Sequence, residues 1–247
     1  MTYSDWALFS YLVVGLYIFF ALRKKCSLKT TLTTIVVICV GITVFCRLFW
    51  IVDNIDKFKS GQYGLAQIFM LRMTGFKIIG VLLGAIAGTC IVAKIFKDEK
   101  KYIVDASTES LFLGAAYTKI LCTLCKECCF GDVIDPAWFG VYGRHLTALY
   151  EVFVWLIGFA MLHILKGKVK HDFTRISISV IWYILVRMFI LEGLYEGAVF
   201  MGSWPFRIIY GSIVAFCTYG IIKRARADKK AQVETAKEPE KVEAKAE

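Results

Sequence analysis

The chain has 247 residues, of which 58% are hydrophobic and 20% are charged, and its formal net charge is +10. Soluble domains are nearer to about 45–50% apolar, so the composition argues against a soluble protein and for membrane helices. The positive charge would suggest a nucleic-acid partner in a soluble chain, but here Lys and Arg gather between apolar runs, as they do beside membrane spans. We therefore expect the membrane as a partner, and no nucleic acid.

The apolar runs are of the length that crosses a bilayer, about 20 residues each. They predict an all-α, polytopic integral membrane protein with about seven transmembrane helices. The predicted spans are about Trp6–Leu22, Thr31–Val52, Phe76–Phe96, Tyr102–Leu124, Leu149–Leu165, Ile176–Leu194 and Trp204–Ile222.

Charge in the connections predicts the orientation. The first, third and fifth connections and the start of the tail are rich in Lys and Arg, whereas the intervening connections are mixed or acidic. The positive-inside rule then places the N-terminus outside and the C-terminus inside. We divide the chain into a seven-helix transmembrane domain, residues 1–222, and a charged cytoplasmic tail, residues 223–247. The tail has almost no large apolar residue, so we expect it to be disordered or a frayed helix.

Three glycines, Gly80, Gly84 and Gly88, recur at four-residue spacing in the third predicted span. They share one helix face, where a neighbouring backbone can approach closely, so they predict helix packing.

Five cations are expected in the outer half of the membrane, and ionisable residues at such depth usually mark a site. A cluster of Arg and Lys there would suit an anionic lipid headgroup, although structural ion pairs and snorkelling side chains are alternatives. The five are Arg47, Lys119, Arg144, Arg187 and Arg207.

The stretch Cys122–Glu151 connects the fourth and fifth spans and faces the outer side in this orientation. His145 could act there as a general base or a hydrogen-bond donor, with Tyr150 and Glu151 beside it at the mouth of the fifth span. Four cysteines, at positions 122, 125, 128 and 129, could hold zinc or an iron–sulfur cluster, but their spacing is unlike that of a usual zinc site. We therefore assign no metal and no cofactor.

Several motifs in this order resemble those of the prolipoprotein diacylglyceryl transferase family. The run His145-Leu146-Thr147-Ala148-Leu149-Tyr150-Glu151 resembles the family's H-P-T-Q-L-Y-E, and Cys128-Cys129-Phe130-Gly131 resembles its C-C-F-G. The glycines of the third span, Arg47-Leu48-Phe49-Trp50, Asp105 before Lys119, and Tyr183 with Arg187 and Glu192 also match family positions. The resemblance covers about residues 1–222.

The resemblance implies a multi-pass enzyme of the bacterial plasma membrane. It would transfer a diacylglyceryl group from phosphatidylglycerol to the lipobox cysteine of a prolipoprotein. Arg144, Arg187 and Lys119 are the candidates for the lipid phosphate, with Arg207 as a further headgroup contact. His145 is the candidate base, with Tyr150 and Glu151 orienting it, and Glu192 and Gly131 support the site.

Two other functions remain open at this stage. Leu146, Ala148 and Lys119 replace the family's Pro, Gln and Arg. A relative that binds lipid or a lipoprotein without catalysis would explain these replacements. A small-solute transporter would use the same charges to line a pathway, and its polar residues would continue to the inner surface.

Overall fold

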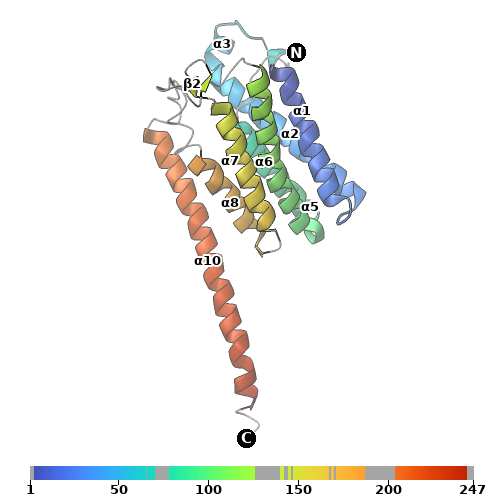
Figure 1. Ribbon diagram of the computed structural model, residues 1–247, viewed down its shortest axis with the longest axis vertical. Coiled ribbons are helices and arrows are strands. Elements are labelled where there is room, and N and C mark those ends of the chain that lie inside the picture. Colours follow the sequence, from blue (N-terminus) through green and yellow to red (C-terminus); the bar gives the residue numbers. More distant parts are fainter. Residues whose placement is uncertain are drawn as a thin grey trace.

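A bundle of long helices forms the computed structural model of this chain (Figure 1). The structure describes residues 3–64, 66–69, 78–125, 140–141, 144–145, 147–166, 168–169, 171–186 and 204–243. The helices are α1 (Tyr3–Leu22), α2 (Leu28–Asp53), α3 (Ile55–Lys59), α4 (Ala66–Phe69), α5 (Ile78–Ile95), the 3₁₀ turn η2 (Lys97–Glu99), α6 (Lys100–Cys125), α7 (Thr147–Ile164), α8 (Asp172–Leu185) and α10 (Trp204–Glu243). The two-residue strands β1 (Gly140–Val141) and β2 (Arg144–His145) pair antiparallel. The described chain is thus overwhelmingly helical, as the sequence predicts.

Each of the seven predicted spans overlaps one helix of the structure. α1, α2, α5, α6, α7, α8 and α10 follow the predicted order, and the end of the span predicted at Ile176–Leu194 lies outside the described residues. We call the end of the bundle where α6 ends and α7 begins the upper end, and the end with the α7–α8 connection the lower end, as they appear in Figure 1.

The glycine face of α5 packs on α2, as predicted. A β-carbon added at Gly80 would lie 2.7 Å from the Cα atom of Cys46, and one added at Gly84 would collide with the carbonyl oxygen of Gly41. Real side chains do not fit at such distances, so these glycines allow the two backbones to touch. The contact anchors α5 within the bundle.

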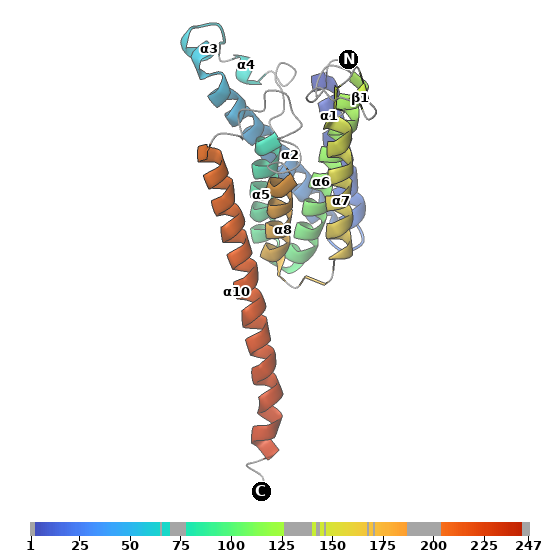
Figure 2. The same cartoon turned by 60° about the vertical axis from the view of Figure 1, so that its left-hand side comes forward.

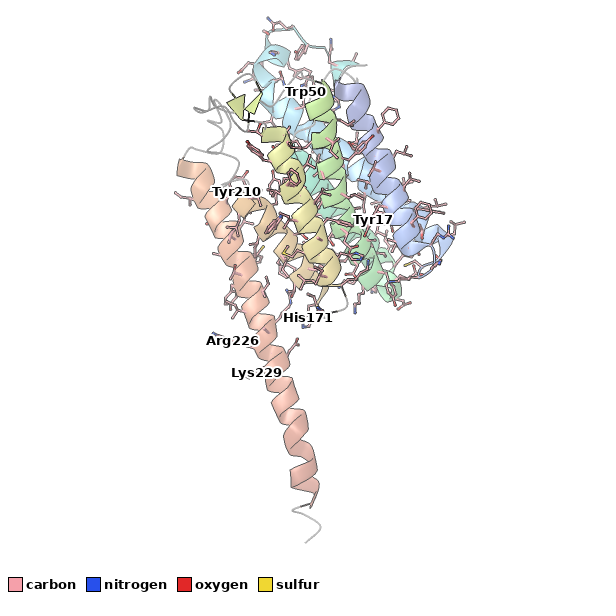
Figure 3. The ribbon with its side chains drawn as sticks, in the orientation of Figure 1. Tyr17, Trp50, His171, Tyr210, Arg226 and Lys229 are labelled. Atoms are coloured by element: carbon pink, nitrogen blue, oxygen red, sulfur yellow. The ribbon has the colours of Figure 1, made fainter. Side chains whose placement is uncertain are left out.

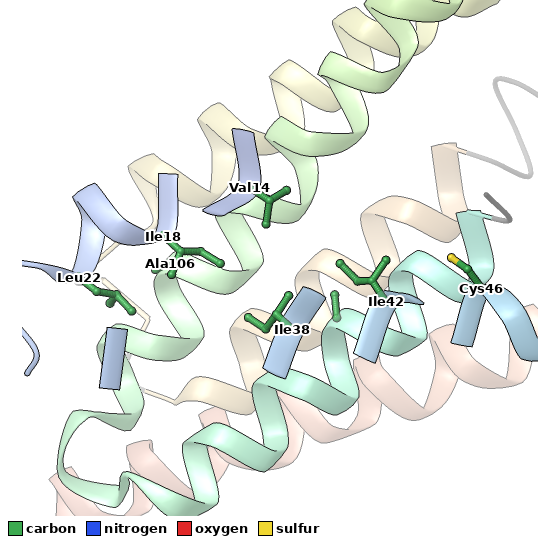
Figure 4. Close-up of a cluster of buried hydrophobic side chains, with 8 residues drawn as sticks. Val14, Ile18, Leu22, Ile38, Ile42, Cys46 and Ala106 are labelled. Atoms are coloured by element: carbon green, nitrogen blue, oxygen red, sulfur yellow. The ribbon is translucent and has the colours of Figure 1, made fainter. Parts of the chain in front are cut away.

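Apolar side chains from α1, α2, α5 and α6 form the first core cluster (Figure 4). Its buried members are Val14, Ile18, Leu22, Ile38, Ile42, Cys46, Ala85 and Ala106. A second cluster joins α5, α6, α7, α8 and α10 around Phe112, Trp155 and Tyr183. α5 and α6 contribute to both clusters, so these two helices connect the two parts of the core.

The outer faces of α1 and α2 expose stripes of large apolar side chains. On α1, Leu12, Leu16 and Phe20 repeat every four residues and are 56%, 47% and 62% exposed. An apolar surface of this extent is unfavourable in water but suits lipid. Among the described residues, Leu28–Val52 and Thr147–Ile164 are long and apolar enough to cross a membrane, and three shorter apolar helices accompany them. The count of seven spans and the orientation stay predictions.

α10 runs beside α8 and then continues past the lower end, so that its C-terminal part projects away from the bundle (Figures 1 and 2). Phe173 of α8 makes two contacts with α10. Its ring meets that of Phe216 edge to face, and the Arg224 guanidinium lies 4.0 Å from the centre of the Phe173 ring. His171, labelled at the lower end in Figure 3, lies 3.1 Å from the Asp228 carboxylate. The charged segment after residue 222 is helical as far as Glu243. The division into a membrane domain and a tail stays a prediction.

Candidate active site

The predicted site residues divide between the described and the undescribed parts of the chain. Lys119 lies on α6, Arg144 and His145 form β2, and Tyr150 and Glu151 lie in the first turns of α7. The backbone of Arg207 belongs to the first turn of α10. The residues outside the described part are Arg187, Glu192 and Gly131.

Lys119 and Glu151 form an ion pair between α6 and α7. The ammonium nitrogen of Lys119 lies 2.9 Å from Oε1 of Glu151, whose side chain is fully buried, while that of Lys119 is 15% exposed. A buried carboxylate is costly unless it is paired and hydrogen-bonded, and Lys119 supplies the charge. The structure therefore brings together two of the residues that the sequence assigns to the site.

Trp155 contacts the same carboxylate from one turn further along α7. Its indole Nε1 donates to Oε2 of Glu151 at 3.3 Å. The indole is 1% exposed and stacks with Phe112 of α6 and Tyr183 of α8, with ring centres 5.7 and 5.6 Å apart. Sequence analysis missed Trp155, although its position four residues after Glu151 places both on one helix face.

The strand pair leads directly into this part of α7. Gly140 pairs with His145 and Val141 pairs with Arg144, so the chain turns back on itself before α7 begins at Thr147. Thr147 is fully buried, one turn before Glu151. The backbone of Arg144 and His145 thus lies at the upper end, seven and six residues before Glu151 along the chain.

A second charged group lies at the lower end of α6 and was missed by the sequence analysis. Glu109 is fully buried and accepts from the Tyr17 hydroxyl, the Arg175 guanidinium and the Lys166 ammonium, the last at 3.0 Å. Arg175, 2% exposed, also lies 3.1 Å from Asp105 through Nε and donates to the carbonyl oxygen of Leu162 at 2.8 Å. We call Asp105, Glu109, Arg175, Lys166 and Tyr17 the Glu109 network.

The two charged groups are separated by apolar packing. Ten residues divide Glu109 from Lys119, about 15 Å along α6. Phe112 and Ala116, both 1% exposed, lie on α6 between them, and Trp155 lies on α7 below Glu151. These buried apolar side chains thus lie between the two charged groups along α6 and α7.

The described side chains include those of several free cysteines, among them Cys26 and Cys217. No group of three or more His, Cys, Asp or Glu among the described residues could hold a metal ion. The metal hypothesis for the four cysteines concerns side chains outside that part of the chain. In the α1–α2 connection, burial and the nearby Glu99 carboxylate raise the pKa of the Cys26 thiol to about 11, so it stays protonated near neutral pH. A protonated thiol is a poor nucleophile.

Comparison with known proteins decides the family. The sequence profile of prolipoprotein diacylglyceryl transferase matches residues 2–223, nearly the whole chain. The chain belongs to the prolipoprotein diacylglyceryl transferase family. A phosphatidylglycerol–prolipoprotein diacylglyceryl transferase of Dehalococcoides mccartyi is 24% identical over 169 residues, which cover 63% of each chain. The match thus covers less than two thirds of that relative. Family membership confirms the resemblance seen in the sequence motifs, and it places the Lys119–Glu151 pair inside the region that the profile matches.

Proposed function

We propose that this protein transfers a diacylglyceryl group from phosphatidylglycerol to the lipobox cysteine thiol of a prolipoprotein. Family membership supports the reaction class. The observation that carries the proposal is the Lys119–Glu151 pair, a cation held by a buried carboxylate at the end of the bundle where Arg144 and His145 precede α7. We propose that this upper end faces the outer side of a bacterial plasma membrane, with the C-terminus inside.

The chemistry is a substitution at carbon. The cysteine sulfur forms a bond to the glycerol carbon of the lipid, the bond between that carbon and the phosphate oxygen breaks, and glycerol phosphate leaves with the electron pair. The thiol proton must be removed because the thiolate is the nucleophile. Negative charge grows on the departing phosphate, so cations fixed beside it lower the barrier.

We assign these roles to the residues that the sequence predicts for the site. Lys119, Arg144 and Arg187 bind the phosphate, and Arg207 contacts the headgroup. His145 accepts the thiol proton. Tyr150 and Glu151 orient these groups, and Glu192 and Gly131 shape the site. The ion pair with Lys119 supports an orienting role for Glu151, because the carboxylate holds the ammonium group in place.

The separation of the two charged groups favours an enzyme over a transporter. A transport pathway needs polar groups that continue from one side to the other. Here the stacked rings of Phe112, Trp155 and Tyr183 pack α6, α7 and α8 together below Glu151. Buried aromatic rings between the two described charged groups are an argument for the enzyme.

The test is glycerol phosphate release by the purified protein in micelles that contain phosphatidylglycerol and a lipobox peptide. A peptide with Ser in place of Cys, and the Arg187→Ala variant, are the controls. We expect release that requires both the thiol and Arg187. Bound phosphatidylglycerol without any release would instead indicate a relative that binds lipid without catalysis.

A further inference from the structure

We propose that Trp155 is a positioning residue of the transferase site, acting on Glu151 through its indole N–H. The inference rests on the proposed function. Glu151 has no exposed surface, and the two oxygens of its carboxylate have different partners: Lys119 at Oε1 and Trp155 at Oε2. Because each oxygen is engaged by a protein donor, the carboxylate cannot rotate without losing one of the two contacts.

The indole is itself held in one orientation. Phe112 of α6 and Tyr183 of α8 stack on it with interplanar angles of 18° and 15°. Stacked aromatic side chains in a close-packed core rotate only if several neighbours move. Packing among α6, α7 and α8 therefore fixes the direction of the indole N–H. The N–H in turn restrains the Glu151 carboxylate, and the carboxylate restrains the Lys119 ammonium.

The position of Lys119 matters in the proposed reaction because the ammonium must lie where phosphate charge develops. A donor that is displaced by a fraction of an ångström still binds the lipid but stabilises the transition state less. Loss of the indole N–H should therefore lower kcat more than it raises KM for phosphatidylglycerol.

The chain contains a matched control in Trp182 of α8. Its indole Nε1 also donates at 3.3 Å, but to the backbone carbonyl oxygen of Val154 on α7. Trp182→Phe and Trp155→Phe thus each remove one hydrogen bond that an indole N–H donates, and the two hydrogen bonds have the same donor–acceptor distance. They differ in that the first leaves the carboxylate of Glu151 with its indole donor.

The experiment measures glycerol phosphate release, KM for phosphatidylglycerol and thermal unfolding for the wild type and both variants. We expect Trp155→Phe to lower kcat by about 10-fold to 100-fold with KM within about twofold, the effect of losing a hydrogen bond to a charged group. Trp182→Phe should keep wild-type kcat. If Trp155→Phe does not fold, benzothienylalanine at position 155 keeps the bicyclic ring and lacks the N–H.

A double-mutant cycle adds a measurement that a packing role would not change. In a Glu151→Gln background, the further change Trp155→Phe should alter kcat by less than about twofold, because the ion pair with Lys119 through which Trp155 acts is already gone. Equal kcat for Trp155→Phe and Trp182→Phe, or additive effects in the cycle, would overturn the inference and leave the proposed function standing. A wild-type protein that releases no glycerol phosphate would overturn both.

Discussion

The Lys119–Glu151 pair and the Glu109 network resemble each other in their central residues but differ in their surroundings. Each is built on a fully buried glutamate with a lysine nitrogen close by, at 2.9 Å for Lys119 and 3.0 Å for Lys166. In the Glu109 network, Arg175 bridges two carboxylates, and the donors come from α1, from α8 and from the connection between α7 and α8. At the upper end, the pair joins α6 to α7 and lies near the strand that carries Arg144 and His145.

The different surroundings suit the two charged groups to different roles, one structural and one in binding. A cation that bridges two buried carboxylates cannot turn to a ligand without leaving charge unpaired, which is expensive in a core. The Glu109 network is therefore suited to holding α1, α6 and α8 together. The Lys119–Glu151 pair, with a lysine that is 15% exposed, is suited to presenting a positive charge to a phosphate.

The largest effect on stability is expected at Arg175. Arg175→Ala removes the guanidinium from Asp105, Glu109 and the Leu162 carbonyl oxygen, and leaves two buried carboxylates without it. Breaking a buried pair in this way costs about 3–5 kcal/mol. Thermal unfolding in detergent measures the loss. Arg226→Ala, on the exposed part of α10, is the control and should unfold like the wild type. A stable Arg175→Ala protein would show that the network is not structural.

A smaller loss of stability is expected at Tyr17. Tyr17→Phe removes one hydroxyl donor from Glu109, while Arg175 and Lys166 stay in place. The expected cost is about 1–2 kcal/mol, with turnover per folded molecule unchanged. Tyr11→Phe is the matched control, since the Tyr11 hydroxyl bonds Thr43 at 3.0 Å between neutral groups. If Tyr17→Phe lowered turnover at wild-type stability, the Glu109 network would belong to the catalytic machinery.

The smallest effect is expected where α10 meets the α7–α8 connection. His171 and Asp228 lie 3.1 Å apart, but both side chains are 40% or more exposed. Exposed pairs contribute less than about 1 kcal/mol, so Asp228→Asn should change neither unfolding nor turnover measurably. A large loss of turnover would instead connect the position of α10 to the site at the other end of the bundle.

The sequence predicted the helices well because their signal is local. The apolar runs place α5, and the spacing of Gly80, Gly84 and Gly88 predicts a helix face that packs closely on a neighbour. The structure adds that this neighbour is α2. Lys119 and Glu151 were both assigned to the site from motifs, and the structure adds that they are paired. Their roles, and those of Arg187, Arg207 and Glu192, stay predictions.

The Glu109 network escaped the sequence analysis because its partners are distant along the chain. Tyr17 and Arg175 lie 92 and 66 residues from Glu109. A single local signal existed: Asp105 and Glu109 are four residues apart, which places two carboxylates on one face of an apolar helix. Such a pair demands buried cations, but no spacing rule indicates which ones.

The most direct test of the account compares two lysines, each paired with a buried glutamate. Lys119→Ala and Lys166→Ala are assayed for glycerol phosphate release per folded molecule, with Lys119→Arg as the variant that keeps the charge. We expect Lys119→Ala to lose about 100-fold or more in kcat, Lys119→Arg to keep most of the activity, and Lys166→Ala to stay within about twofold of the wild type. Equal activities of Lys119→Ala and Lys166→Ala would contradict the assignment of the site to the upper end.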